Sequence, residues 1–139
     1  MISFNYLVAN NFDKLNKSFY SNWLKSVIKA EGKKIGEIQY IFCDDKHLHK
    51  INKTYLNHDT FTDIITFPTT DNNDIISGEI YISIDRITEN STVQSVSFIE
   101  ELHRVMVHGV LHLIGYNDHS PSEKKLMRRK EDYYLHLQR

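Results

Sequence analysis

Apolar residues recur along the chain in two patterns, and together these predict alternating strands and helices. Short alternating or β-branched runs predict strands over Ile2 to Val8, Gly36 to Cys43, Ile64 to Phe67 and Glu79 to Ile84. Spacings of three and four residues predict helices over Phe12 to Ala30, Lys46 to about Tyr55, Glu100 to Ile114 and Ser120 to about Leu137. Asp85 predicts the cap of a further helix to about Asn90, and the polar stretch Ser91 to Ser97 predicts a connection. This mixed order predicts an α+β fold, with a mixed sheet of about four strands and about five helices packed on it.

The helical spacing also predicts which side chains face the core. In the first long helix the apolar stripe consists of Phe12, Leu15, Phe19, Trp23, Leu24, Val27 and Ile28. In the last helix it consists of Leu126, Met127, Tyr133, Tyr134 and Leu137. A chain of 139 residues with 40% hydrophobic residues can bury one core, so we expect residues 1–139 to form a single domain.

The charge balance restricts the possible partners. The net charge is -1, so the chain has no overall basic field of the kind that drives non-specific nucleic-acid binding, and an RNA partner would need a local basic patch. The last helix offers one, in Lys124, Lys125, Arg128, Arg129 and Lys130. A solvated helix face is the ordinary interpretation of such a run, and an RNA-binding patch is the alternative.

Cysteine usage and the N-terminus favour a cytoplasmic protein. Cys43 is the only cysteine, which excludes an internal disulfide and suits a reducing compartment; its apolar surroundings predict a small core residue. Met1 to Asn10 lacks the features of a signal peptide, and no 18 consecutive residues are apolar, so no membrane partner is expected. The sequence does not indicate an oligomeric state.

The stretch from His108 to His119 carries the candidate chemistry. If residues 100 to 114 are helical, His108 and His112 stand one turn apart on the same face. Gly115 can take a positive φ and end the helix, so that the chain can turn back and bring His119 to the same point. Three neutral imidazoles leave one position of a tetrahedral Zn²⁺ open, which is the composition of a catalytic site. The stretch predicts one metal ion per chain, held by these three histidines, with zinc as the predicted metal; nickel and cobalt also suit three imidazoles.

These histidines have two other interpretations. The helix around them is strongly apolar, and a histidine on such a helix is often a hydrogen-bonded core residue. In H-E-x-x-H metalloproteases a glutamate follows the first histidine as the general base, but Gly109 stands there in this chain. Peptide hydrolysis is therefore disfavoured.

Two segments together resemble one family, the YbeY type of bacterial endoribonuclease implicated in ribosomal RNA maturation. Val107 to Tyr116, with His119, is similar to that family's H-G-x-L-H-L-x-G-Y-D-H signature. Ile51 to Pro68 is similar to its L-N-x-x-Y-R-x-x-D-x-x-T-D-V-L-S-F-P pattern, and Ser77 to Ser83 resembles the G-D-I-x-I-S strand that follows. The resemblance implies a small α+β domain, a three-histidine zinc site and single-stranded RNA as the substrate. It also implies a cytoplasmic role in small-subunit ribosomal RNA 3′-end maturation and ribosome quality control, with the ribosome or its small subunit as partner.

The chain departs from the family's pattern at two positions. The family places its third histidine six residues after the second, whereas His119 stands seven after His112, as though Asn117 were inserted. Asp118 is the alternative third ligand, although a carboxylate changes the charge and the reach. At the second position Leu56 stands where the pattern has arginine, so a phosphate-binding group is lost.

Groups beyond the metal ligands are less well defined. Arg104 shares a helical face with His108 and is the predicted substitute for the lost arginine, with a solvated arginine as the alternative. Lys124 and Arg128 are further candidates for substrate binding. His58 and Asp59 are candidate accessory groups, although an ordinary turn residue is the other interpretation of Asp59. The alternative function is a non-enzymatic ribosome assembly factor with a structural zinc site.

Overall fold

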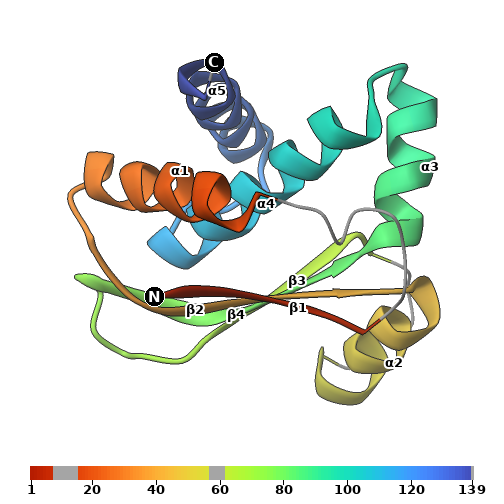
Figure 1. Ribbon diagram of the computed structural model, residues 1–139, viewed down its shortest axis with the longest axis horizontal. Coiled ribbons are helices and arrows are strands. Elements are labelled where there is room, and N and C mark those ends of the chain that lie inside the picture. The colour runs from red at the N-terminus through yellow and green to blue at the C-terminus, as the bar shows by residue number, and fades with distance from the viewer. Residues whose placement is uncertain (8–15, 57–61, 139) are drawn as a thin grey trace.

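A computed structural model of the protein describes residues 1–7, 16–56 and 62–138 (Figure 1). Within them the elements are β1 (Ile2–Tyr6), α1 (Lys17–Ala30), β2 (Lys34–Cys43), α2 (Asp45–Leu56), β3 (Ile64–Pro68), β4 (Ile75–Ser83), α3 (Ile84–Gln94), α4 (Phe98–Ile114) and α5 (Pro121–Leu137). These four strands and five helices confirm the predicted α+β fold class.

The strands form one mixed sheet, as predicted, and their order is β1-β2-β4-β3. β1, β2 and β4 run parallel to one another, whereas β3 pairs antiparallel with β4 and forms an edge. Alternation along β4 sends Ile76, Ile80 and Ile82 into the core. α4 packs against β3 and β4, so its motif lies over this edge of the sheet.

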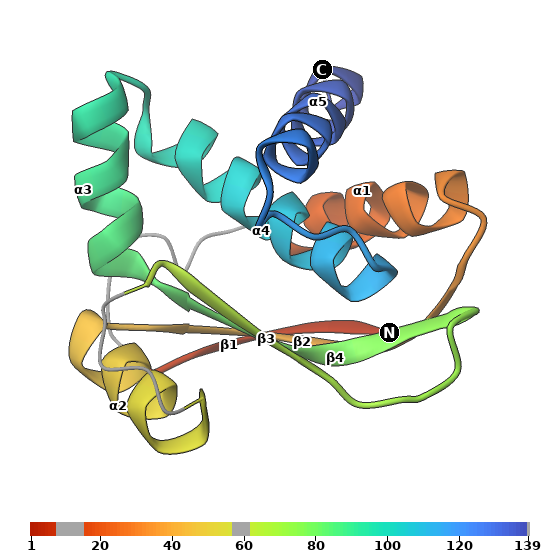
Figure 2. The ribbon, with the colours of Figure 1, turned by 180° about the vertical axis from the view of Figure 1, so that it is seen from behind.

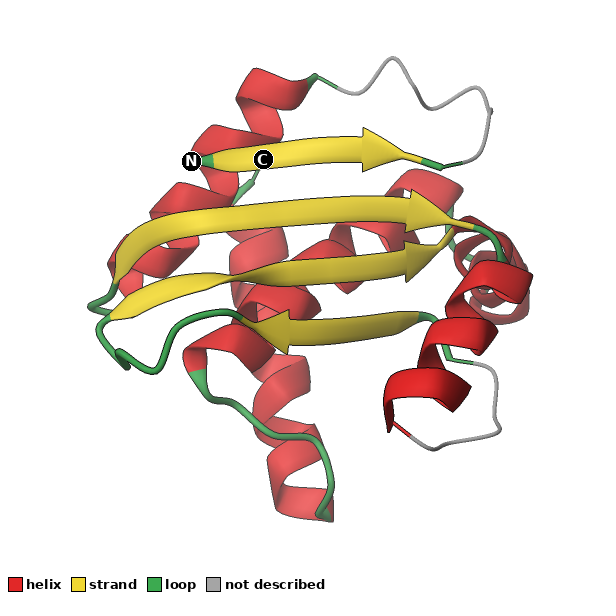
Figure 3. Ribbon diagram, turned by 90° about the horizontal axis from the view of Figure 1, so that it is seen from below, coloured by secondary structure: helices red, strands yellow, loops and turns green. Residues whose placement is uncertain are grey.

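The helices divide unequally between the two faces of the sheet. α1 and α4 cover one face, and α5 packs on α4 away from the strands (Figure 1, Figure 2). α2 lies over one end of the opposite face (Figure 3). The larger core, between the sheet and its helix layer, includes Leu24, Tyr40, Ile80 and Met106. A smaller apolar group under α2 consists of Cys43, Leu48, Ile51 and Ile65.

Gly109 allows α4 to approach the sheet closely. A Cβ at this position would lie 2.9 Å from Cδ1 of Ile64 and 2.9 Å from Cγ2 of Ile80, closer than real Cβ contacts. The buried hydroxyl of Tyr40 in β2 also donates to the carbonyl of Met106 over 2.7 Å. Together these contacts fix the height and the rotation of α4, and hence the direction in which its histidines point.

The ends of α4 follow from local sequence. The Ser97 side chain accepts a hydrogen bond from the amide of Glu100 and begins the helix, two residues before the predicted start. Gly115 has a φ of 126°, and its amide bonds to the carbonyls of Leu111 and His112. The prediction that glycine ends this helix is confirmed.

The predicted boundaries of α3 and β4 were also wrong. α3 is capped by Ser83 rather than Asp85, and it continues through Gln94 instead of ending at Asn90. Ser91 is buried, with its hydroxyl bonded to the carbonyl of Thr88, so the polar stretch that predicted a connection is partly helix. β4 starts at Ile75 and passes through the predicted break at Ser77 and Gly78, because pairing with β2 and β3 outweighs local propensity.

The predicted apolar stripes are partly correct. α1 buries Trp23, Leu24, Val27 and Ile28 as predicted, together with Tyr20, whereas Phe19 is exposed. Phe12 and Leu15 lie outside the described residues. α5 buries Met127, Tyr134 and the unpredicted Glu131, and leaves Leu126, Tyr133 and Leu137 exposed. In the part of the chain that the structure describes, no helix has both the length and the apolar character needed to cross a bilayer.

Candidate metal centre

α4 presents His108 and His112 on the same side, as their spacing predicts. The two ring centroids lie 4.5 Å apart with the planes nearly perpendicular, and about a fifth of each side chain is exposed, 20% and 23%. Both rings are thus accessible from solvent, unlike the aliphatic side chains of Val107 and Leu111 beside them. The interpretation of these histidines as enclosed core residues does not fit this exposure.

The carboxylate of Asp118 meets both histidines. Its Oδ2 atom lies 3.4 Å from Nε2 of His108 and 3.4 Å from Nε2 of His112. Across residues 1–7, 16–56 and 62–138, no other three His, Cys, Asp or Glu side chains bring potential ligand atoms within 4.8 Å of one another. Ligands bound at about 2.0 Å to a tetrahedral Zn²⁺ lie about 3.3 Å apart, so this donor set fits a single ion.

His119, the predicted third ligand, lies beside this group. Its side chain is exposed and lines the same hollow as His108 and His112, but its ring is not among the ligand atoms that converge. Asp118 stands six residues after His112, the separation that the resembled signature has for its third histidine. The geometry favours Asp118, and ligation by His119 stays a prediction.

A buried carboxylate holds the other side of the His108 ring. Oε2 of Glu131, on α5, lies 2.6 Å from Nδ1 of His108, and only 6% of the Glu131 side chain is exposed. Oε1 of Glu131 accepts from Nη1 of Arg104 over 2.8 Å, and Nη2 of Arg104 donates to Asp132 over 2.7 Å. A carboxylate at Nδ1 selects the tautomer in which Nε2 has a free lone pair for a metal.

Glu131 was not among the predicted site residues, although the sequence contains an indication of its role. Glu131 lies four residues after Met127 and three before Tyr134, both of which are buried, so it occupies the core stripe of α5. A charged residue inside an apolar stripe is costly unless it is paired, and it therefore marks a position with a charged or hydrogen-bonding partner.

The loop that carries Asp118 is tied to two helices. The ring of His112 hydrogen-bonds to the backbone of Tyr116, and the Tyr116 hydroxyl donates to Oε1 of Glu31 over 2.5 Å. Glu31, at the end of α1, also accepts from the hydroxyl of Tyr134 and from Lys130 at 3.1 Å. These bonds hold the chain between Gly115 and Asp118 in place.

The electrostatics of the site suit a cation. Burial opposes the charged form of His108, but Glu131, with Asp118 and Asp63 nearby, outweighs burial and raises the pKa of His108. Burial and the charge of His108 lower the pKa of His112. Burial raises the pKa of Asp63, and the neighbouring carboxylates add to that rise. Several carboxylates thus surround two imidazoles, and a divalent ion would offset their repulsion.

Two hollows meet at this site. One, of about 410 Å³, extends toward α2 and β3, and its walls include Asn52, Leu56, Thr62, Thr66 and His119. The other, of about 280 Å³, lies between α3, α4 and α5. Asp63, His108 and Asp118 belong to the walls of both, so the candidate metal centre lies where the two hollows join.

The remaining predicted site residues have different surroundings. Arg104 is mostly buried and engaged by two carboxylates, so it is not the solvated side chain of the alternative interpretation, and substrate binding by it stays a prediction. Lys124 and Arg128 are exposed and line the hollow beside α5. His58 and Asp59 lie outside the described residues.

Comparisons with known proteins match nearly the whole chain to one family. The profile of the family described as Endoribonuclease YbeY matches residues 6–138. Proteins named Endoribonuclease YbeY from Flavobacterium psychrophilum and Flavobacterium johnsoniae are 53% and 52% identical to this chain, over 99% and 95% of it and 96% and 93% of their own lengths. The solution structure of TM1509 from Thermotoga maritima is similar with a TM-score of 0.69 and 27% identity, covering 97% of this chain and 87% of that one. The chain therefore belongs to the Endoribonuclease YbeY family.

Proposed function

We propose that this protein is a metal-dependent endoribonuclease that cuts single-stranded RNA. The observation that carries the proposal is the convergence of Nε2 of His108, Nε2 of His112 and a carboxylate oxygen of Asp118 where two hollows join. The names of its relatives support RNA as the substrate class. We further propose that it acts in the cytoplasm with the ribosome or its small subunit, in 3′-end maturation of the small-subunit RNA and in ribosome quality control.

The proposed cofactor is one Zn²⁺ per chain. His108 and His112 would supply two ligands and Asp118 the third, with His119 as the alternative, which leaves a fourth position open. When bound, the ion supplies a Lewis acid that polarises a phosphoryl oxygen or the attacking group.

The residues around the ion would orient its ligands through hydrogen bonds. Glu131 holds the Nδ1 proton of His108, so Nε2 keeps its lone pair. The backbone of Tyr116 also interacts with the His112 ring and favours its protonated form. Arg104 offsets the charge of Glu131 through a hydrogen bond of 2.8 Å. Either water or the 2′-hydroxyl of RNA can be the nucleophile, and in both cases positive charge near the phosphate stabilises the transition state.

A nuclease assay on single-stranded RNA tests this function. We expect the purified protein to cleave, and we expect both His112→Ala and removal of the metal with a chelator to abolish cleavage, with zinc restoring activity only to the chelated protein. His47→Ala, which changes an exposed histidine on α2, is the control and should cleave normally. Equal cleavage by the wild type, His112→Ala and the chelated sample would indicate a contaminating nuclease.

The same assay distinguishes the proposed nuclease from the second candidate function, an assembly factor with a structural metal site. Glu131 braces α5 against the metal-binding face of α4, so an ion here could also stabilise the fold of an assembly factor. Stoichiometric zinc, a large fall in melting temperature on chelation and no RNA cleavage would support that structural role.

A further inference from the structure

We propose that Lys124 and Arg128 on α5 bind backbone phosphates of the RNA on one side of the metal centre. The strand would pass from the hollow beside β3, over the metal ligands, into the hollow between α3, α4 and α5. This inference rests on the proposed function, because it concerns the path of the same substrate.

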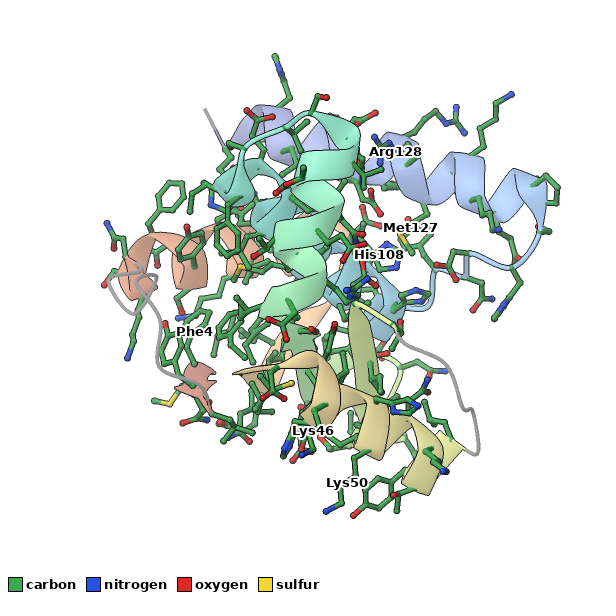
Figure 4. The ribbon with its side chains drawn as sticks, turned by 90° about the vertical axis from the view of Figure 1, so that its right-hand side faces the viewer. Phe4, Lys46, Lys50, His108, Met127 and Arg128 are labelled. Carbon is green, nitrogen blue, oxygen red and sulfur yellow. The ribbon has the colours of Figure 1, made fainter. Side chains whose placement is uncertain are left out.

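The shape of the site supplies the first reason. An endonuclease cuts within a strand, so nucleotides continue on both sides of the reacting phosphate. The hollow beside β3 and the hollow beside α5 share Asp63, His108 and Asp118 in their walls, which provides a route on each side of that point. Figure 4 shows His108 on α4 close to Met127 and Arg128 on α5, all three of which line the second hollow.

The distribution of positive charge supplies the second reason. Among the described residues that line the hollow beside β3, none is lysine or arginine. The hollow beside α5 is lined by Arg104, Lys124 and Arg128. Arg104 is already engaged by Glu131 and Asp132, at 2.8 and 2.7 Å. The cations available to phosphate groups are therefore Lys124 and Arg128.

These two side chains are free to take a ligand. Both are exposed, and within residues 1–7, 16–56 and 62–138 neither side chain makes a hydrogen bond or an ion pair; the charge of Arg128 acts on Glu101 at longer range. They stand four residues apart, which places them on the same side of α5 about 6 Å apart along its axis. That separation is of the same order as the distance between successive phosphates of an extended single strand.

The acidic residues of the hollow do not oppose this assignment. Glu131 is offset by Arg104 and His108. Only 4% of Glu101 is exposed. Asp63 and Asp118 lie beside the candidate metal centre, where a bound divalent ion would offset their charge.

The chain contains a matched control on the same helix. Lys125 and Arg129 have the same residue types and the same spacing as Lys124 and Arg128, and both are exposed. Arg129 lines a different hollow, formed with α1 residues such as Glu31, and Lys125 does not line the hollow beside α5. Substituting either pair with glutamine removes the same charge.

The test measures binding of a labelled single-stranded RNA oligonucleotide to the full chain carrying His112→Ala, which prevents cleavage. Fluorescence anisotropy over a range of salt concentrations gives the affinity and its salt dependence. With Lys124→Gln and Arg128→Gln together, we expect a roughly tenfold loss of affinity near physiological salt, and a salt slope smaller by about 1.4, since each phosphate contact contributes about 0.7. Lys125→Gln with Arg129→Gln should change both quantities far less.

Each outcome decides a separate point. Equal losses of RNA affinity from the two double substitutions would show only a general attraction of RNA to a basic helix, which would overturn the inference. Unchanged RNA binding after Lys124→Gln with Arg128→Gln would also overturn it. In both cases RNA binding by the parent protein leaves the proposed function intact. No binding of RNA by any of the proteins, including the wild type with zinc, would overturn the proposed function as well. Melting temperatures equal to that of the parent establish that the variants are folded.

Discussion

Oε2 of Glu131 on α5 lies 2.6 Å from Nδ1 of His108 on α4, and the carboxylate is almost completely buried. Glu131→Gln keeps the size of the side chain but removes the charge that makes His108 a better ligand. We expect metal affinity to fall about 10–100-fold, because groups that orient a metal-binding histidine contribute on this scale. Competition with a chelator of known affinity measures the change.

Asp132→Asn is the control for that substitution. Asp132 is the next residue and also pairs with Arg104, but it is 57% exposed and does not touch His108. Its loss should leave metal affinity nearly unchanged. If the two variants lost affinity to the same extent, Arg104 rather than the bond to His108 would be responsible.

The identity of the third ligand is tested by two adjacent substitutions. Because the Asp118 carboxylate lies 3.4 Å from Nε2 of both histidines, we expect Asp118→Ala to lose zinc and activity. His119→Ala should retain zinc, because that side chain is exposed beside the group. Elemental analysis of the two purified proteins gives the answer, and loss of zinc only from His119→Ala would restore His119 as the ligand.

Local sequence was sufficient to predict the fold class and to place His108 and His112 on one side of a helix. His108 and His112 are four residues apart on one helix, which places their side chains on the same side, and the structure shows this arrangement. The route of the chain after Gly115 depends on Glu31, Tyr134 and Lys130, which come from distant parts of the sequence. For that reason spacing alone could not decide between Asp118 and His119.

Glu131 and α3 show why the other features were missed. The interaction of Glu131 with His108 joins residues 23 apart on different helices, and no local pattern reports such a pair. α3 continues past Asn90 because the Ser91 side chain is buried and its hydroxyl donates to the carbonyl of Thr88. Tertiary packing, rather than helix propensity, determines this burial.

Glu31 predicts a pH dependence of stability. Burial opposes its charged form, but the hydrogen bonds from Tyr116 and Tyr134, together with Lys130, lower the pKa of Glu31 below the ordinary 4.5. A carboxyl with a lower pKa in the folded chain stabilises the fold at pH values above the unfolded pKa, and this stabilisation is lost as the pH falls through the folded pKa. Glu31→Gln should therefore lower the free energy of unfolding by about 1–3 kcal/mol at neutral pH.

Denaturant unfolding at several pH values measures this difference. The difference in free energy of unfolding between the wild type and Glu31→Gln should be constant above about pH 5 and should decrease as the pH falls below 4.5. Glu37→Gln is the control, because 83% of the Glu37 side chain is exposed. A gap that did not change with pH would show that the charge of Glu31 does not contribute.

Cys43 should be unreactive in the folded protein. The thiol is fully buried, donates to the carbonyl of Ile82 at 3.6 Å, and has its pKa raised by burial to about 12. At pH 8 only about one thiol in 10,000 is ionised, so a thiol-specific reagent should label the native chain at the rate of unfolding. Rapid stoichiometric labelling of native protein would contradict the burial of this side chain.

Gly109→Ala tests whether the close approach of α4 to the sheet is required. In an unhindered helix this substitution stabilises by up to about 1 kcal/mol, because glycine loses more backbone freedom on folding. Here the new Cβ would lie 2.9 Å from Cγ2 of Ile80, a branch that cannot turn aside, and overpacking of this kind costs about 1–3 kcal/mol. We expect a lower melting temperature in thermal unfolding and weaker zinc binding, because lifting α4 moves His108 relative to Glu131. A higher melting temperature with unchanged zinc affinity would show that the sheet side chains shift to accommodate the methyl group, and that the close approach of α4 does not require glycine.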